Sequence, residues 1–362
     1  MSTEKISIQN DPELLRILME DMERQDKLYK PTPYWQGYCK RIVRELDRSG
    51  LSEFRRKWNV IKGYEYTPLF KNNPFLRRRV DHIIYRIMGL PFLSVVRGKY
   101  DTLVQNLIAQ IQERNNRIYS FVYYFLQTSL VGKEVLKKVD DSGVGNPIAF
   151  MTEGRQYTEN ILNQIVAWCL LSENVDTSSV KKVMEIGVGY GAFAEIIGKL
   201  KSGQLEYFIG IDIPPVLYVA TQYLKAVFPG RVVDYKMVRD MGVIRADDIR
   251  GKFVMLPPWT LPRLSLDIDL LWSIGAFQEM EKQVVGYYFD YIARTTKHIF
   301  MSTLRAGHIP GAGGQKESIP FDWLTGELRK RGYKEESMSN HSPARKTLDV
   351  IVPKYDFAYF TK

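Results

Sequence analysis

The chain has 362 residues, a hydrophobic fraction of 45% and a formal net charge of +10. It has no run of about eighteen uncharged apolar residues, and its first residues lack the apolar core of a signal peptide, so we expect no membrane-spanning helix and a cytoplasmic protein. The only two cysteines, Cys39 and Cys169, lie far apart, which excludes a disulfide framework and a cysteine-based metal site.

The first part of the chain has the pattern of a helical region. From residue 11 to about residue 139, apolar residues recur at intervals of three and four, most clearly over residues 103–130. Prolines divide this region into about five expected helices. We predict a smaller all-helical N-terminal domain over residues 1–144, which covers an acceptor site or serves as an interaction region. The polar stretch 140–147 predicts the junction to a second domain, residues 145–362.

Positive charge is concentrated in residues 51–100, which hold eleven Lys or Arg and three Asp or Glu. Two clusters, residues 55–57 and 77–79, predict either a solvated helix face or a surface for a phosphate-rich partner. Such a partner is a nucleotide-sugar, a lipid-linked glycan, RNA, or a membrane contacted peripherally through residues 55–79. Aromatic residues such as Trp58 lie between the clusters, and they either pack in the core or stack on sugars or bases.

After the junction, strand-like apolar runs alternate with helical ones. The runs are residues 183–186, 207–211, 253–256, 269–274, 298–302, 348–352 and 357–360. This alternation predicts an α/β fold, a mostly parallel sheet with helices on both faces, and the last two runs are expected to form an antiparallel edge. Residues 232–238 compete with 253–256 for the third strand. We favour the later run, because Pro257 and Pro258 end it at the ligand edge.

The sequence EIGVGYG at the end of the first expected strand predicts a nucleotide-type site. Gly187, Gly189 and Gly191 allow a sharp turn, in which a ligand lies against main-chain N–H groups near the start of the next helix. The second strand ends in Asp212, whose carboxylate can accept hydrogen bonds from both hydroxyls of a ribose. The combination predicts a ligand that contains adenosine.

Two cofactor classes fit this turn. As GxGxxA, it matches the dinucleotide fingerprint of an NAD-dependent oxidoreductase; as ExGxGxG, it matches the first motif of class I methyltransferases, which use S-adenosylmethionine (SAM). Glu185 favours SAM, because a carboxylate repels a pyrophosphate but attracts the ammonium group of SAM. The predicted cofactor-binding residues are Glu185, Gly187 and Gly189 at the methionine end, Gly191 in the same turn, Asp212 at the ribose and Ile213 at the adenine. Tyr157 and Asn160, expected on one helix, are predicted to lie at the carboxylate of SAM.

A third segment, LDIDLLWSIGAFQEM at residues 266–280, is an apolar strand that runs into a polar helix start. Together with EIGVGYG, DIPPVLYVATQYL and the GNP of residues 145–147, it resembles the family of sugar O-methyltransferases found in bacterial surface-polysaccharide and natural-product gene sets. The resemblance covers residues 145–308. It implies a class I methyltransferase (Rossmann-like) domain, SAM as the cofactor and methyl transfer to a sugar hydroxyl. RNA or another small molecule as acceptor, and SAM binding without catalysis, stay open as alternatives.

Methyl transfer to a hydroxyl requires an aligned oxygen and a group that accepts its proton. In an open α/β sheet, ligands bind outside the carboxyl ends of the strands, so this group is expected in the loops after the fourth and fifth strands. Those loops carry Gln278, Glu279 and His308, with Arg305 in the same loop as the histidine. His308 is the first choice as base, because a neutral imidazole accepts protons readily near pH 7, and Glu279 is the second. We expect no metal, since no metal-ligand pattern falls at this edge.

Overall fold

The computed structural model describes residues 7–58, 133–308, 316–352 and 354–362, and the statements below concern these residues. The α-helices are α1 (Pro12–Arg24), α2 (Pro33–Ser49), α3 (Phe54–Lys57), α8 (Lys133–Lys138), α9 (Glu159–Ser172), α10 (Ala192–Leu200), α11 (Pro214–Val227), α12 (Tyr235–Val238), α13 (Ala246–Ile249), α14 (Lys282–Thr295), α15 (Phe321–Lys330) and α16 (Pro343–Ile351). The 3-10 helices are η1 (Lys27–Tyr29), η3 (Thr177–Ser179), η4 (Pro258–Arg263) and η5 (Phe277–Glu279). The strands are β1 (Phe150–Thr152), β2 (Arg155–Tyr157), β3 (Lys182–Ile186), β4 (Tyr207–Ile211), β5 (Val232–Val233), β6 (Ile244–Arg245), β7 (Lys252–Leu256), β8 (Leu264–Ser265), β9 (Ile268–Ile274), β10 (Thr296–Leu304), β11 (Lys334–Glu336) and β12 (Tyr355–Thr361).

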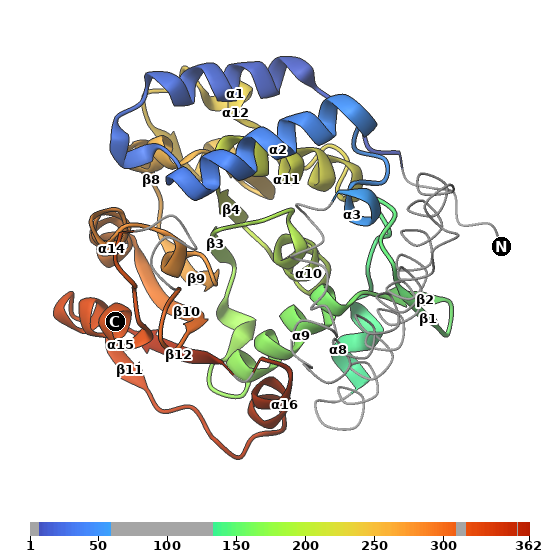
Figure 1. Ribbon diagram of the computed structural model, residues 1–362. Coiled ribbons are helices and arrows are strands. Elements are labelled where there is room, and N and C mark those ends of the chain that lie inside the picture. The colour runs from blue at the N-terminus through green and yellow to red at the C-terminus, as the bar shows by residue number, and fades with distance from the viewer. Residues whose placement is uncertain (1–6, 59–132, 309–315, 353) are drawn as a thin grey trace, which may run out of the picture.

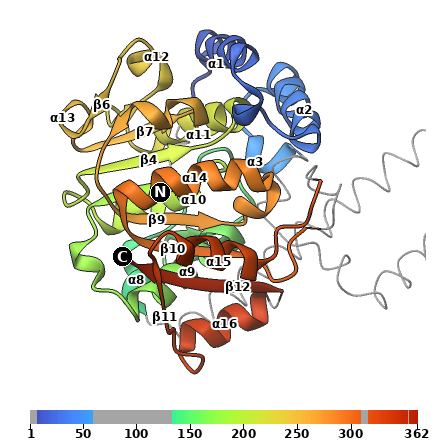
Figure 2. The same cartoon turned by 90° about the vertical axis from the view of Figure 1, so that its left-hand side faces the viewer.

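Eight of the described strands form one sheet, in the order β5, β7, β4, β3, β9, β10, β12, β11. The strands from β5 to β10 run parallel, whereas β12 runs antiparallel to both of its neighbours. Figure 2 shows this stack from β7 and β4 down to β12 and β11. The order reverses at β3, which lies between β4 and β9. Ligands bind at the carboxyl ends of strands around such a reversal, so the fold places a site there.

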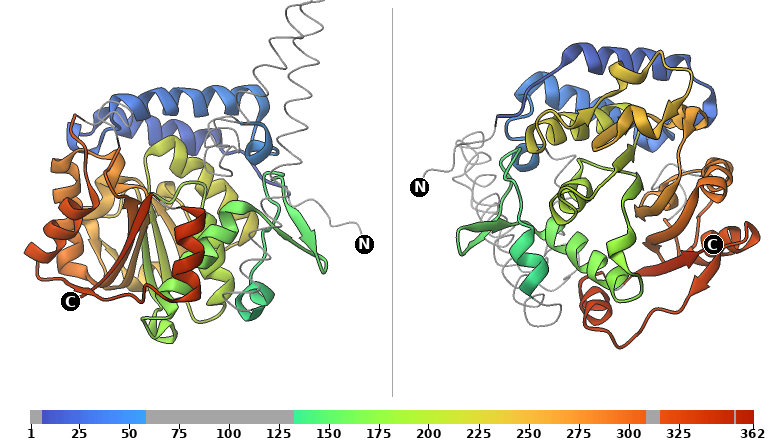
Figure 3. Two further views of the ribbon diagram at one scale, coloured as in Figure 1. Left: turned by 60° about the horizontal axis from the view of Figure 1, so that its bottom comes forward. Right: turned by 180° about the vertical axis from the view of Figure 1, so that it is seen from behind.

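Two buried cores cover the two faces of the sheet. Side chains such as Val183 and Phe208 pack in the core that includes α9, α10 and α11, whereas Met184 and Ile209 pack in the core that includes α14 and α15. Alternate residues of each central strand therefore face opposite cores. Burial on both faces explains why these strands appear in the sequence as continuous apolar runs. Outside the sheet, the hairpin of β1 and β2 projects from the body of the molecule (Figure 3).

The helices α1 and α2 pack against α11 at one end of the molecule, and α1 also contacts α12 (Figure 1). Their buried residues Leu14 and Ile42 belong to the same core as α9, α10 and α11. Asp11 caps α1 by accepting the N–H of Leu14 at 3.0 Å, and its own N–H donates to the hydroxyl of Tyr218 on α11 at 2.8 Å. The first two helices thus share their core with the sheet.

Arg55 of α3 and Asp141 of the junction form an ion pair in which both side chains are 0% exposed. Two bonds join them, from Nη1 to Oδ1 at 2.8 Å and from Nη2 to Oδ2 at 2.6 Å. Thr158, the N-cap of α9, donates to the same Oδ2 at 2.8 Å, and the guanidinium lies 4.7 Å from the ring centre of Tyr190. Burial alone raises the pKa of Asp141, but the charge and hydrogen bonds of Arg55 outweigh burial and hold the pKa below its ordinary value.

The predicted fold class is confirmed: the sheet is mostly parallel, helices lie on both faces, and β12 supplies the antiparallel edge. The favoured third strand is confirmed as β7, while residues 232–233 of the competing run form the outer strand β5. The expectation that Arg55 faces a phosphate-rich partner is wrong, because Asp141 neutralises its charge inside the protein. Trp58 is 0% exposed and donates to Ser49 Oγ at 2.9 Å, so it packs in the core.

One predicted strand is also wrong. Residues 348–352 were expected to be extended, but all except the last belong to α16. Ser342 caps this helix by accepting the N–H of Arg345 at 3.1 Å, and the buried Ala344 and Leu348 lie one turn apart on one face. The strand beside β12 is instead β11, whose sequence Lys-Glu-Glu carries charges suited to a sheet edge.

Several predictions fall outside the described residues. These are the helical pattern over 103–130, the basic cluster 77–79 and most of the segment 55–79 for which membrane contact is predicted. The division into domains at residue 144 also stays a prediction, because residues 59–132 are not described.

Removing one member of the buried ion pair is expected to destabilise the protein strongly. Asp141→Ala leaves the Arg55 guanidinium buried without its carboxylate, which typically lowers the free energy of unfolding by about 3–5 kcal/mol. As a control, Arg16→Ala breaks the exposed Arg16–Glu20 pair, and a change of less than about 0.5 kcal/mol is expected. Urea denaturation followed by circular dichroism measures both, and equal effects of the two variants would contradict the prediction.

Candidate functional site

A cavity of about 1230 Å³ lies at the carboxyl ends of β3, β4 and β9. Its walls come from the loops after these strands, from α9, from α16 and β12, and from the N-terminal segment 27–36, which contains η1 and the start of α2. Pockets that hold one small ligand commonly have about 300–1,000 Å³. The volume therefore suits a cofactor together with a second molecule.

The glycine turn between β3 and α10 forms one wall. Gly187 and Gly189 adopt left-handed backbone conformations, with φ of 82° and 57°. A Cβ on Gly187 would lie 2.4 Å from the Cβ of Ala276, so this position has no room for a side chain. A Cβ on Gly189 would meet no atom within 4 Å, which leaves bare backbone at the cavity surface.

Asp212 follows β4 and ties the turn to this strand. Its Oδ2 accepts the N–H of Gly189 at 2.9 Å, and its Oδ1 accepts the N–H of Ile213 at 2.8 Å. Burial raises the pKa of Asp212 to about 7 despite these two hydrogen bonds, and the negative charge of Glu279 raises it as well. Each oxygen keeps a further lone pair for a ligand hydroxyl. Small changes around neutral pH therefore change the charge of this wall.

Glu185 lies on β3, two residues before the turn, and is 4% exposed. Within the described residues its Oε2 has no hydrogen-bond partner. Burial, and secondly the nearby Asp212, raise the pKa of Glu185 well above its ordinary value. The protein alone thus leaves this carboxyl group poorly compensated, and a cation nearby would lower its cost.

Gln278, Glu279 and His308 lie together on the opposite side of the site. Gln278 Oε1 accepts the N–H of Leu304 at 2.6 Å, which orients the amide so that its Nε2 faces His308 Nε2 at 3.2 Å. An amide N–H donates, so His308 Nε2 carries a lone pair and the ring hydrogen resides on Nδ1. Glu279 Oε1 lies 3.5 Å from the same Nε2. An amide donor and a carboxylate oxygen thus both lie beside the same ring nitrogen.

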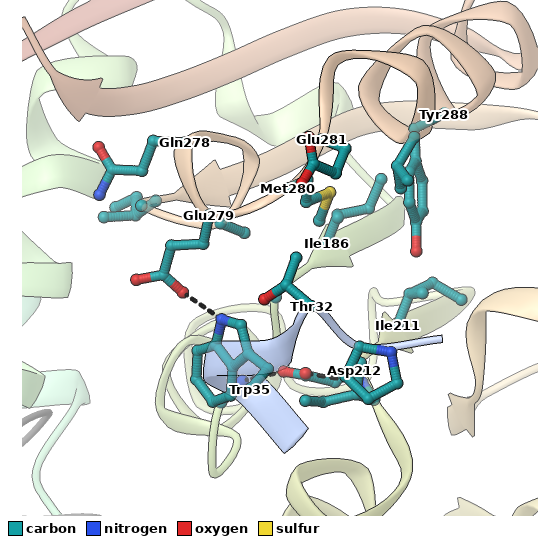
Figure 4. Close-up of a pocket in the computed structure, with 18 of the residues that line it drawn as sticks. Thr32, Trp35, Ile186, Ile211, Asp212, Gln278, Glu279, Met280, Glu281 and Tyr288 are labelled. Atoms are coloured by element: carbon teal, nitrogen blue, oxygen red, sulfur yellow. Dashed lines mark hydrogen bonds between the residues drawn. The ribbon is translucent and has the colours of Figure 1, made fainter. Parts of the chain in front are cut away.

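The N-terminal segment contacts this cluster directly. Trp35 Nε1 donates to Glu279 Oε2 at 3.0 Å, as the dashed line in Figure 4 shows. The hydroxyl of Tyr29 donates to that of Tyr287 on α14 at 3.0 Å. The segment is therefore attached at two points to the part of the chain that carries Glu279.

The structure brings most of the predicted residues to one cavity. The cofactor-site residues that line it are Gly187, Gly189, Asp212, Ile213 and Asn160, and the predicted catalytic residues that line it are Gln278 and Glu279. His308 and Glu185 are not among the lining residues, although His308 contacts both Gln278 and Glu279. Gly191 closes the turn before α10 and packs near Leu224 of α11.

Tyr157 requires a correction. It ends β2 instead of lying on a helix, it is 1% exposed, and its hydroxyl donates to the carbonyl oxygen of Leu136 at 2.7 Å. It therefore points away from the cavity. Arg305 pairs with Asp356 at 2.9 Å and does not line the cavity either. The sequence pattern missed Trp35 and Tyr29, because the two prolines before α2 mark a helix start but do not indicate where the helix docks.

Among the described residues, no group of three or more His, Cys, Asp or Glu is arranged to hold a metal ion. None of the described helices has the length and apolar character needed to cross a bilayer. Both cysteines are buried, and burial raises the pKa of the Cys39 and Cys169 thiols to about 12. Such thiols are poor nucleophiles near neutral pH.

No protein-family model and no curated protein matches the sequence. Magnesium protoporphyrin IX methyltransferase from Synechocystis PCC 6803, solved with bound SAH, is similar at 12% identity over 55% of this chain and 80% of that chain, with a TM-score of 0.36. Human N-acetylserotonin methyltransferase in complex with SAM is similar at 14% identity over 55% and 51%, with a TM-score of 0.36. Mitomycin 7-O-methyltransferase is similar at 13% identity over 56% of this chain and 54% of that chain, with a TM-score of 0.36. Similarities this low assign neither a ligand nor a reaction to this chain.

The geometry of the turn predicts a difference between two glycines. Gly187→Ala places a Cβ against Ala276 and also strains a left-handed backbone, whereas Gly203→Ala has the same strain, at φ 75°, in open space. The strain costs about 1–2 kcal/mol in both variants, and the close contact adds about 1–3 kcal/mol for Gly187→Ala alone. Urea denaturation of the two variants measures this difference. Equal destabilisation would show that the turn can shift away from Ala276.

Proposed function

We propose that this protein transfers a methyl group from SAM to a hydroxyl group, and that the acceptor is a sugar. One arrangement carries the proposal. The glycine turn and Asp212 line the same cavity as Gln278 and Glu279, and these last two residues contact His308.

The side formed by the glycine turn suits SAM in shape and charge. Gly189 exposes backbone, Asp212 offers oxygens to ribose hydroxyls, and Ile213 offers apolar surface to adenine. The uncompensated Glu185 favours a ligand with a positive charge at the turn, which the ammonium of SAM provides. The pyrophosphate of NAD would instead add negative charge beside two carboxyl groups. These observations favour SAM over NAD.

When bound, SAM supplies a methyl group on a positively charged sulfur, which is reactive toward an oxygen nucleophile. The protein must hold the acceptor hydroxyl in line and remove its proton. For this step the acceptor hydroxyl replaces the Gln278 amide N–H at the lone pair of His308 Nε2. Glu279 then stabilises the resulting imidazolium. The N-terminal segment 27–36 lines the same cavity and limits the access of water.

The remaining lining supports a sugar as the acceptor. It combines hydrogen-bonding side chains with aromatic rings, namely Asn163, Gln164, Glu281, Trp35, Tyr288 and Tyr355. Sugar hydroxyls bind to polar groups, while the C–H faces of a sugar pack on rings. The resemblance of residues 145–308 to sugar O-methyltransferases points to the same class. An RNA acceptor has less support, since Arg55 is buried.

A phosphate on the acceptor, as in a nucleotide-sugar or a lipid-linked glycan, remains part of the proposal. Four lysines line the cavity, Lys27, Lys30, Lys282 and Lys316. Lys282 pairs with Glu317 at 2.6 Å, so the other three are better placed to meet a phosphate.

Binding of SAM is expected to depend on pH through Asp212. SAM and S-adenosylhomocysteine should bind with micromolar affinity, and NAD should not. Because the pKa of Asp212 lies at about 7 and its ionised form accepts the ribose hydroxyls, the affinity for SAM should fall about tenfold from pH 8 to pH 6. Asp212→Asn should weaken binding at pH 8 by about 1.5–3 kcal/mol and reduce the pH dependence.

Isothermal titration calorimetry at several pH values measures these affinities. Asp240→Asn, which changes an exposed aspartate outside the cavity, is the matched control and should bind like the wild type. Binding of NAD without binding of SAM would overturn the assignment.

The rate of methyl transfer is expected to depend on His308. At saturating SAM, His308→Ala should lower the rate constant about 10²- to 10⁴-fold and change the affinity for SAM by no more than a few fold, because the imidazole meets the acceptor and not the cofactor. The wild-type rate should rise with pH as an imidazole loses its proton, and the variant should lack this rise.

The assay detects deuterated-methyl transfer from labelled SAM to a panel of sugars and nucleotide-sugars by mass spectrometry. His341→Ala, at an exposed histidine, is the control and should keep the full rate. If His308→Ala also keeps its rate and pH profile, the base lies elsewhere, and Glu279→Gln is the next variant to test.

A further inference from the structure

We infer that Trp35 is a positioning residue whose indole N–H holds the Glu279 carboxylate against the His308 imidazole. The inference rests on the proposed function, in which His308 accepts the proton of the acceptor. If it is right, Trp35 influences His308 through Glu279, and this influence can be measured in the protein without turnover.

The two carboxylate oxygens of Glu279 have different partners. Oε2 accepts the indole N–H of Trp35 at 3.0 Å (Figure 4). Oε1 lies 3.5 Å from His308 Nε2. The side chain of Glu279 is 27% exposed, so water competes for both oxygens. A flexible carboxylate keeps one orientation only when its partners compensate the lost rotamer freedom. The indole bond fixes Oε2 and thereby directs Oε1 to the imidazole.

Trp35 packs beside Tyr38 on α2, and the neighbouring η1 is attached to α14. The Trp35 ring centre lies 5.1 Å from that of Tyr38, and the guanidinium of Arg41 lies 4.1 Å from the Tyr38 ring centre. On the other side, the Tyr29 hydroxyl bonds to Tyr287 of α14. The segment that carries the indole is therefore anchored by its own contacts. A side chain must be fixed in this way to orient a carboxylate.

Within the described part of the chain, side chains of η5 and β12 lie around the His308 imidazole. Gln278 and Glu279 face it from η5, Tyr355 of β12 contacts Gln278, and the charge of Asp212 acts on Glu279. The adjacent residues 309–315 contain no titratable side chain. Of these groups, Glu279 is the one whose carboxylate lies within contact distance of Nε2, so its orientation decides whether a carboxylate oxygen faces the imidazole.

The test compares the titration of His308 in four forms of the full chain: wild type, Trp35→Phe, Glu279→Gln and the double variant. NMR of the ring protons follows it, and His308→Gln assigns the signal among the four histidines. Glu279→Gln should lower the midpoint pH, because the imidazolium loses its carboxylate. Trp35→Phe should lower it in the same direction, and the double variant should match Glu279→Gln alone, since Trp35 acts through Glu279.

Trp58→Phe is the matched control. It removes an indole hydrogen bond of similar length, 2.9 Å to Ser49, from a buried tryptophan that does not line the cavity, and it should leave the His308 midpoint unchanged. An unchanged His308 midpoint in folded Trp35→Phe would overturn the inference. So would a double variant whose midpoint differs from that of Glu279→Gln by as much as Trp35→Phe differs from the wild type.

In the methyl-transfer assay, Trp35→Phe should lower kcat about tenfold with the affinity for SAM unchanged. If the protein transfers no methyl group, the proposed function fails, while the NMR result still decides whether Trp35 orients Glu279.

Discussion

The buried ion pair of Arg55 and Asp141 is the constraint that joins the N-terminal helices to the candidate site. Its guanidinium comes from α3, its carboxylate from the junction, and Thr158 extends it to the start of α9. The same guanidinium lies over Tyr190, which stands between two glycines of the turn and accepts a hydrogen bond from Asn160 at 3.2 Å. In a medium of low dielectric constant, such a network tolerates little displacement, because every broken bond leaves a buried charge or polar group unsatisfied. The shape of the turn thus depends on a residue more than a hundred positions earlier in the chain.

Two buried carboxyl groups, those of Asp212 and Glu185, lie close together at the glycine turn. Burial raises the pKa of both Asp212 and Glu185 above their ordinary values. Groups of this kind favour the folded state most at low pH, and this contribution is lost as pH rises through the raised pKa. The ligand-free protein therefore pays for these carboxyl groups in stability near and above neutral pH. A cationic ligand reverses that cost, since it favours the ionised forms. The residues that lower the stability of the ligand-free protein are thus the same ones that favour a positively charged ligand.

Local patterns predicted the parts of the site that strands position. The glycine turn, Asp212, Gln278, Glu279 and His308 each follow a strand, and parallel strands bring their carboxyl ends to one edge, so spacing along the chain was sufficient. The predictions that were wrong or missing depend on contacts that local patterns do not reveal. Arg55 sits in a run of basic residues that resembles a solvated helix face, and only its long-range partner Asp141 makes it a core residue. Trp35 reaches the cavity because α2 docks on α11, a packing contact without a local signature. In α16, capping by Ser342 outweighed an apolar run that also suits a strand.

The packing of α1 and α2 has a consequence for how the protein acquires its structure during synthesis. Asp11 bonds to Tyr218, 207 residues later, and Trp35 to Glu279, 244 residues later. Chains whose contacts span such distances close them slowly. On the ribosome, the first helices emerge with their apolar faces uncovered, and they stay so until α11 has been made. The nascent chain therefore acquires a complete cavity only after most of the sheet exists.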